Sequence, residues 1–131
     1  DNGTTTTFAQ CDANGSLKIV QRGVPVKTVA TGSGAIATSY APSAAFWLDA
    51  ITIHLSAAPT TAGDLTVTLD AADGAAYDTV LFSLDPSEQS DTDVVYIPDQ
   101  PLLCMSGDAI AVAYTNTDGR TYGLRIIARL A

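Results

Sequence analysis

Two short segments decide the fold of this chain: Ile51-Thr52-Ile53-His54-Leu55 and Leu65-Thr66-Val67-Thr68-Leu69. In each segment apolar side chains alternate with polar ones, which is the period of a β-strand that buries one face. In the first segment this parity places His54 on the polar face, beside Thr52. Both segments therefore predict half-buried strands of a sheet that covers a core.

Similar but shorter patterns occur along the rest of the chain. They predict further strands at residues 16–21, 24–30, 77–84, 94–97, 109–115 and 122–130. Pro25 suits an edge strand, and Asn116-Thr117-Asp118-Gly119 is typical of a hairpin between the last two strands. No window of a dozen residues has helical periodicity. About eight short strands indicate an all-β protein, an antiparallel β-sandwich with jelly-roll-like or immunoglobulin-like strand order.

The chain of 131 residues is long enough for one compact domain. Residues 1–15 are polar without a sustained period and predict an N-terminal arm, with Phe8 as a candidate anchor on a neighbouring subunit. Residues 16–131 are expected to form a single sandwich domain. Within it, residues 31–45 are rich in Gly, Ser and Ala and predict a long connection. Met105 is the only methionine, so Asp1 is not expected to be the translated start.

The charge is strongly acidic and unevenly distributed. Fourteen acids against six bases give a net charge of −8, and no Lys or Arg lies between Thr28 and Gly119. Such a chain is not expected to bind nucleic acid, which requires a positive field. No apolar run approaches the roughly 20 residues of a membrane span. The charge pattern has two interpretations: solubility, or basic edges of one copy that meet acidic faces of another.

Few residues suggest catalysis or metal binding. His54 is the only histidine, and no nucleophile motif accompanies it. Asp70, Asp73 and Asp78 surround a turn, and Asp91 lies near Asp93; these carboxylates could bind Ca²⁺, although turn aspartates usually bond to local backbone. We therefore expect no enzyme activity, no cofactor and no metal. A small hydrolase remains an alternative only because Asp and Ser are abundant.

The two cysteines leave two possibilities. A bridge between Cys11 and Cys104 would close a long loop and add on the order of 4 kcal/mol of stability. Cys104 also lies in the apolar run Pro101-Leu102-Leu103-Cys104-Met105, where a buried free thiol is equally natural.

Some residues are candidates for an interface with another subunit. On the strand at 122–130, Arg125, Ile127 and Arg129 share the face opposite to the apolar one. Trp47 has parity opposite to that of its neighbours, so it is a candidate sugar-stacking platform, core edge or subunit contact. The complete set of candidates is Phe8, Trp47, Arg120, Arg125, Ile127 and Arg129.

Two stretches resemble a known family. They are Trp47-Leu48-Asp49-Ala50-Ile51-Thr52-Ile53-His54-Leu55-Ser56-Ala57-Ala58-Pro59-Thr60-Thr61, with the Leu65–Asp70 segment after it, and Leu102-Leu103-Cys104-Met105-Ser106-Gly107-Asp108-Ala109-Ile110-Ala111-Val112-Ala113-Tyr114-Thr115-Asn116. Both resemble small β-sandwich proteins of tailed-bacteriophage virions.

The resemblance implies a virion structural protein, of which head decoration (cement) proteins are the first expectation and tail or fibre parts the neighbouring one. The implied location is the capsid surface, and the implied partners are the major capsid protein or other virion subunits. A homo-oligomer, dimer or trimer, is expected. The alternative from a different class is a carbohydrate-binding β-sandwich module.

Overall fold

A computed structural model describes residues 10–11, 17–18 and 23–131. The strands are β1 (Gln10–Cys11), β2 (Leu17–Lys18), β3 (Pro25–Gly32), β4 (Ile36–Tyr40), β5 (Phe46–Leu55), β6 (Leu65–Asp70), β7 (Thr79–Leu84), β8 (Asp93–Tyr96), β9 (Leu102–Cys104), β10 (Ala109–Tyr114) and β11 (Tyr122–Leu130), with one 3₁₀ turn, η1 (Ala75–Tyr77). The all-β prediction is confirmed.

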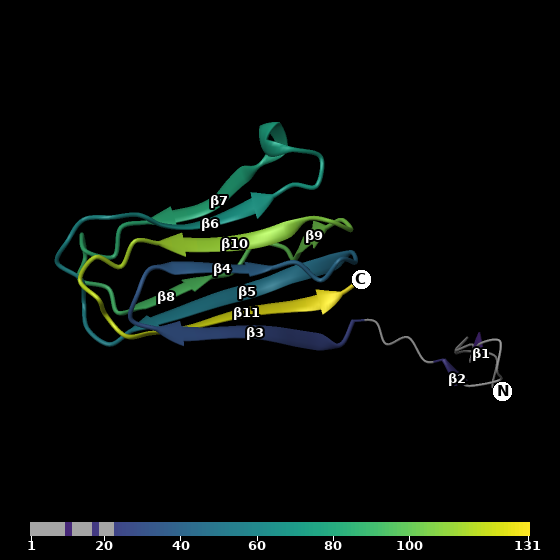
Figure 1. The fold of residues 1–131 in the computed structure, drawn as a ribbon, viewed down its shortest axis with the longest axis horizontal. Helices are drawn as coiled ribbons and strands as arrows, with labels where there is room; N and C mark the ends of the chain where they lie inside the picture. The colour runs from purple at the N-terminus through teal and green to yellow at the C-terminus, as the bar shows by residue number, and fades with distance from the viewer. Residues whose placement is uncertain (1–9, 12–16, 19–22) are drawn as a thin grey trace.

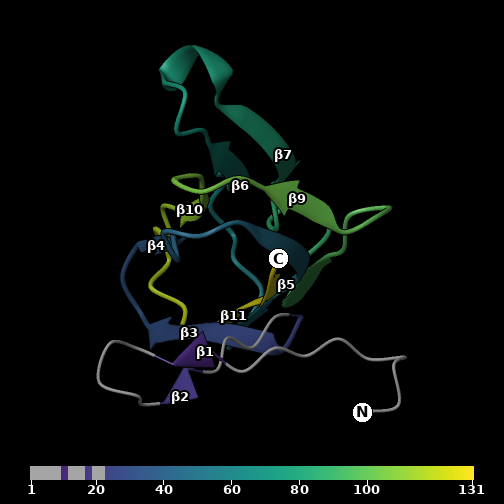
Figure 2. The ribbon, with the colours of Figure 1, turned by 90° about the vertical axis from the view of Figure 1, so that its right-hand side faces the viewer.

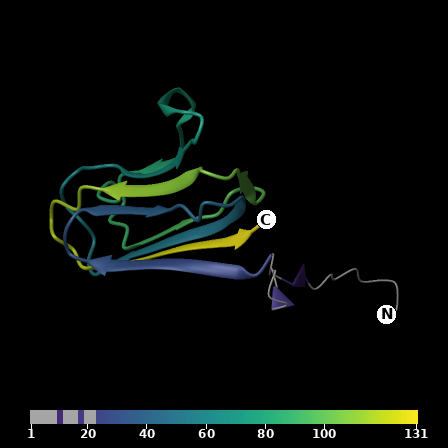
Figure 3. The ribbon, with the colours of Figure 1, turned by 45° about the vertical axis from the view of Figure 1, so that its right-hand side comes forward.

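Two antiparallel sheets stack face to face (Figures 1 and 3). The β3 sheet has the order β3-β11-β5-β8, with β9 also paired to β5, and the β4 sheet has the order β4-β10-β6-β7. Most consecutive strands lie in opposite sheets, and only β6 and β7 form a hairpin within the β4 sheet. If β8 and β9 are counted as one interrupted strand, this is the order of an eight-stranded jelly roll. The jelly-roll order, of the two predicted, is therefore the observed one.

The core lies between the sheets and follows the predicted parity. Ile51, Ile53 and Leu55 of β5 are buried, whereas His54 is exposed. The same alternation buries Leu65 and Val67 of β6. These side chains, with those of the other strands, form one continuous apolar cluster.

A β-bulge in β5 keeps this parity consistent with that of β11. Ile127 pairs with Ala50 and Ala128 with Leu48, so Asp49 is the extra residue. A one-residue insertion reverses which face each side chain occupies. Phe46 and Leu48 before the bulge, and Ile51 after it, therefore all point into the core.

The expected long connection at residues 31–45 is wrong, because β4 occupies its middle. Ile36 is buried and β4 pairs with β10 along its whole length. The alternation in this strand is weak, because the exposed Ala37 is apolar and the half-buried Thr38 is polar. The connections that remain, at residues 33–35 and 41–45, are short. β9 likewise adds a strand to the eight predicted.

The expected hairpin at Asn116-Thr117-Asp118-Gly119 is also wrong. The turn exists, since the Gly119 N–H donates to the Asn116 carbonyl, but β10 and β11 belong to opposite sheets. The Asn116 side chain explains the difference: its amide donates to the carbonyls of Ser33, Gly34 and Arg120, and its Oδ1 accepts from the Arg120 N–H. These bonds make the turn an arch between the sheets.

The N-terminal predictions are tested only in part. β1 pairs with β2, but the rest of the predicted arm at 1–15, including Phe8, lies outside the described residues, as does most of the predicted strand at 16–21. The edge-strand prediction for the segment containing Pro25 is confirmed, because β3 is the outer strand of its sheet.

Cys104 is a free thiol, so the bridge to Cys11 is absent. Its side chain is fully buried, opposite Phe46 in the register of β9 and β5. Burial, and secondarily the charge of Asp108, raises the pKa of the Cys104 thiol to about 11.

We predict that Asn116→Ala destabilises the fold for two reasons: the side-chain hydrogen bonds of Asn116 are lost, and alanine is strained at the positive φ of this position. Asn116 is 3% exposed and has a φ of 50°. Unpaired buried groups cost about 1–3 kcal/mol, and a left-handed φ costs an alanine about 1–2 kcal/mol more. Asn116→Gly retains the φ, so its free energy of unfolding, measured in urea, should fall by less. Equal losses in the two variants would contradict the backbone contribution.

Cys104 should resist alkylation in the folded protein. With a pKa of about 11, only about one thiol in a thousand is ionised at pH 8, and burial excludes the reagent as well. Iodoacetamide should therefore modify the Cys104 peptide only after unfolding in guanidinium, as read by mass spectrometry. Rapid modification of that peptide in the native protein would show that the thiol is accessible.

Candidate functional site

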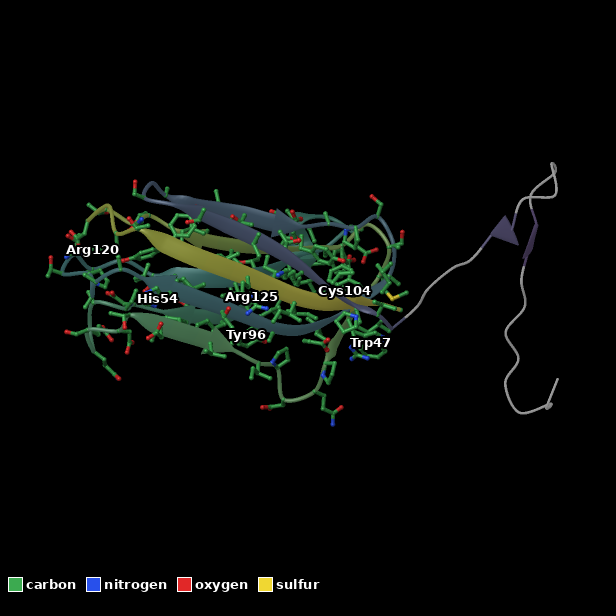
Figure 4. The ribbon with its side chains drawn as sticks, turned by 90° about the horizontal axis from the view of Figure 1, so that it is seen from below. Trp47, His54, Tyr96, Cys104, Arg120 and Arg125 are labelled. Carbon is green, nitrogen blue, oxygen red and sulfur yellow. The ribbon has the colours of Figure 1, made fainter. Side chains whose placement is uncertain are left out.

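The outer face of the β3 sheet combines exposed apolar side chains with basic ones. We name it the contact face and define it by the outward residues Lys27, Val29, Thr31, Trp47, Thr52, His54, Asp93, Val95, Ile97, Leu103, Gly123, Arg125, Ile127 and Arg129 (Figure 4). Val29 is 61% exposed, Val95 57% and Ile97 65%. Exposed apolar groups that gather on one face, with arginines among them, are typical of interaction surfaces.

A groove of about 510 Å³ lies at one end of the contact face. Its floor is Gly123, which pairs with Thr31 of β3 on one side and His54 of β5 on the other. Since glycine has no side chain, a depression remains between its neighbours. Arg125 and Val95 are among the residues that line the groove farther along the strands.

His54 and Asp93 form an ion-pair-like contact at the edge of the groove. Their atoms Nδ1 and Oδ1 are 2.5 Å apart, and both side chains are well exposed. The hydrogen bond from His54 lowers the pKa of Asp93, a change that desolvation partly opposes and the Thr92 hydroxyl reinforces. In the described part of the chain, no hydroxyl is hydrogen-bonded to His54. The pair therefore lacks the positioned nucleophile that a hydrolytic triad requires.

The cations of the contact face differ in their partners. Arg129 donates through Nε and an η nitrogen to the two carboxylate oxygens of Asp49, at 2.8 and 3.1 Å. The bulge thus supplies the acid that neutralises Arg129, and this bond raises the pKa of Arg129. Within residues 23–131, by contrast, Arg125 and Lys27 have no acidic partner. Two unpaired cations on one face stand out in a chain with a net charge of −8.

The structure brings together four of the six predicted interface residues. Trp47, Arg125, Ile127 and Arg129 lie on the contact face, with Trp47 at the end away from His54 (Figure 4). Arg120 lies instead in the arch after Asn116, where the backbone N–H and carbonyl of Arg120 both bond to the Asn116 amide. Phe8 lies outside the described residues.

Sequence reasoning missed much of the contact face. Val29, Val95 and Leu103 come from strands that are distant in sequence. Only the strand order places Val29 and Val95 in the row of Arg125, and Leu103 in the row of Trp47 and Arg129. Their parity was a usable signal, because each alternates with a buried or half-buried neighbour. The sequence alone, however, does not say which strands share a sheet.

The outer face of the β4 sheet has a different chemistry. Its outward residues are small and uncharged over most of the sheet: Ala37, Ser39, Thr66, Thr68, Ala111 and Ala113. The described lysine and arginine residues of strands β3–β11 are Lys27, Arg125 and Arg129, and all of them lie in the β3 sheet. The two faces therefore present different surfaces to a partner.

Two of the candidate calcium ligands have local partners. Asp78 accepts a hydrogen bond from the Ala71 N–H at 2.9 Å, and Asp93 is paired with His54. Among the described residues, no group of three His, Cys, Asp or Glu side chains could hold a metal ion. Over the same residues, no helix is long and apolar enough to cross a membrane.

Comparisons with known proteins identify no family for this chain. No protein-family model matches the chain, and no curated protein matches it significantly.

The low pKa of Asp93 is predicted to depend on His54. In the variant His54→Ala the pKa of Asp93 should rise toward the ordinary value of about 3.9, because the largest stabilisation of the carboxylate is lost. Carboxyl-detected NMR titration measures this directly. The matched control is Asp85, whose pKa is lowered by hydrogen bonds from Ser87 and should not change. An unchanged Asp93 would show that the pair does not form in solution.

The sign of the effect on stability follows from the direction of the shift. A carboxyl whose pKa is lower in the folded state stabilises the fold above its unfolded pKa, and this contribution is lost as the pH falls through the folded value. The pair should thus make stability fall with acidification below about pH 4.

Proposed function

We propose that this chain is a non-enzymatic structural protein of a tailed-phage virion, and specifically a capsid decoration (cement) protein that binds the outer shell. The contact face is the observation that carries the proposal. It gathers exposed apolar side chains and unpaired cations on one sheet of a sandwich whose described residues hold no catalytic arrangement.

The fold supports this function by analogy. Jelly rolls of two sheets recur in viral capsid and lectin domains, although a fold alone does not fix a function. The stretches at 47–61, 65–70 and 102–116 that resemble virion proteins include most of β5 and all of β6, β9 and β10. β5, β6 and β10 are inner strands of the two sheets, and β9 pairs with β5. The resemblance therefore concerns the body of the sandwich.

The physical chemistry of the contact face also supports a protein partner. Leu103 and Trp47 are opposite each other in the register of β9 and β5, and Ile97 continues the outward side of β8. Burying such apolar surface contributes roughly 25 cal/mol per Å². Cations in the same surface give orientation and raise the association rate with an acidic partner.

The carbohydrate-binding alternative has less support from the geometry. No Phe, Tyr or Trp is among the described residues that line the groove, and Trp47 lies at the other end of the contact face (Figure 4). A sugar ring in the groove would thus lack the stacking platform that such sites commonly use.

Co-sedimentation with phage heads tests the proposal. The full chain should sediment with undecorated heads of the phage that encodes it. The variant Ile97→Asp should weaken attachment by about tenfold or more, because it buries an unpaired charge in the contact. The matched control is Ser39→Asp on the outer face of the β4 sheet, which should bind like the unmodified chain.

Failure of the unmodified chain to sediment with heads would overturn the decoration role. Attachment to purified tails instead would assign the chain to the tail. Equal attachment of all variants would show that the contact face is not the shell-binding surface.

A further inference from the structure

The β6–β7 hairpin carries an acidic, aromatic tip at residues 70–78. Figures 1 and 2 show that this tip projects beyond the sandwich. Asp70, Asp73 and Asp78 are exposed, and Tyr77 is 64% exposed. None of the residues of η1 is buried. An aromatic ring exposed in this way, between carboxylates, lies outside the core cluster and contributes little to the packing of the monomer.

The tip has a defined shape. The Asp78 carboxylate accepts from the Ala71 N–H, and the Tyr77 N–H donates to the Gly74 carbonyl, both at 2.9 Å. Its base is fixed as well, because the buried Asp108 carboxylate accepts from the Ala72 N–H at 2.9 Å. A tip held in this way loses little conformational entropy when it binds.

The groove of the contact face has the complementary chemistry. Arg125 lies in its lining without an acidic partner, beside the exposed apolar groups of Val29 and Val95. The acid at its edge, Asp93, is already paired with His54. The groove volume of about 510 Å³ lies within the range of roughly 300–1,000 Å³ that is usual for ligand pockets, so it can hold a tyrosine ring with its flanking chain.

We propose that the groove of one copy binds the β6–β7 tip of a second copy. Tyr77 enters the groove between Val29 and Val95, and the carboxylates near it pair with Arg125. Charge complementarity favours this occupant: the tip carries acids without cations, and in the groove Arg125 has no acidic partner while Asp93 is hydrogen-bonded to His54. The proposal goes beyond the proposed function: it names a partner for the groove end of the contact face and does not involve the shell.

The geometry of this contact has a consequence for symmetry. The groove belongs to the β3 sheet and the tip to the β4 sheet, so the two copies use different surfaces. Such a heterologous contact forms a ring if the rotation closes and an open chain if it does not.

Sedimentation velocity over a range of protein concentrations tests the contact. The full chain should self-associate, and more weakly at high salt. Arg125→Glu in the groove and Tyr77→Lys in the tip should each raise the dissociation constant by about tenfold or more, since each places like charges together. Ser39→Lys, on the outer face of the β4 sheet, is the matched control and should associate normally. Thermal unfolding checks that all three variants fold.

A mixture of the two variants provides the decisive measurement. The Arg125→Glu chain retains a tip and the Tyr77→Lys chain retains a groove, so one intact contact can form between them. At a protein concentration at which each variant alone is monomeric, the mixture should therefore yield one-to-one dimers.

Three results would overturn the inference: a monomeric unmodified chain, loss of association in only one of the variants, or a mixture without dimers. The inference and the proposed function fail separately. A monomeric chain that still sediments with heads retains the proposed function, and a chain that self-associates but ignores heads retains the inference.

Discussion

The pairing of β11 with β5 at the middle of the β3 sheet is the interaction on which the other features depend. One face of β11 supplies Leu124, Ile126 and Ala128 to the core, and the other supplies Gly123 and Arg125 to the contact face. The hydrogen-bonded register thus fixes the core and the surface at the same time. A slip by one residue would exchange them.

The bulge at Asp49 shows how closely these requirements are coupled. If the same residues formed a regular strand without the bulge, Phe46 and Leu48 would point to solvent and Trp47 into the core, given the parity of Ile51. The bulge resolves this conflict, and the Asp49 carboxylate is then positioned to neutralise Arg129. Arg125, four residues earlier on the same face, has no such acid. The difference between a satisfied and an unsatisfied arginine therefore comes from one inserted residue.

Much of this architecture could be predicted from sequence alternation, and the errors have physical causes. The strands around Ile53, Val67 and Ile126 were predictable because large apolar residues mark their buried faces. β4 was not, since its exposed Ala37 is apolar and its half-buried Thr38 is polar. The turn at Asn116 was misassigned because a β-turn has the same local sequence whether its strands pair or separate; the distant carbonyls of Ser33 and Gly34 decide between the two. The contact face was predictable only for Trp47 and along β11, because the neighbours of these residues are set by strand order.

Gly123 has a consequence for how readily this surface can change. A β-carbon added there would meet no atom within 4 Å, and its φ is not one that requires glycine. Glycine is an unfavourable residue inside a strand, so a larger residue would fit and would make the sheet more stable. The chain keeps a less stable residue at the one place where a side chain would fill the groove. One substitution at Gly123 would close the groove and leave the sandwich intact. The binding surface and the scaffold can therefore evolve independently.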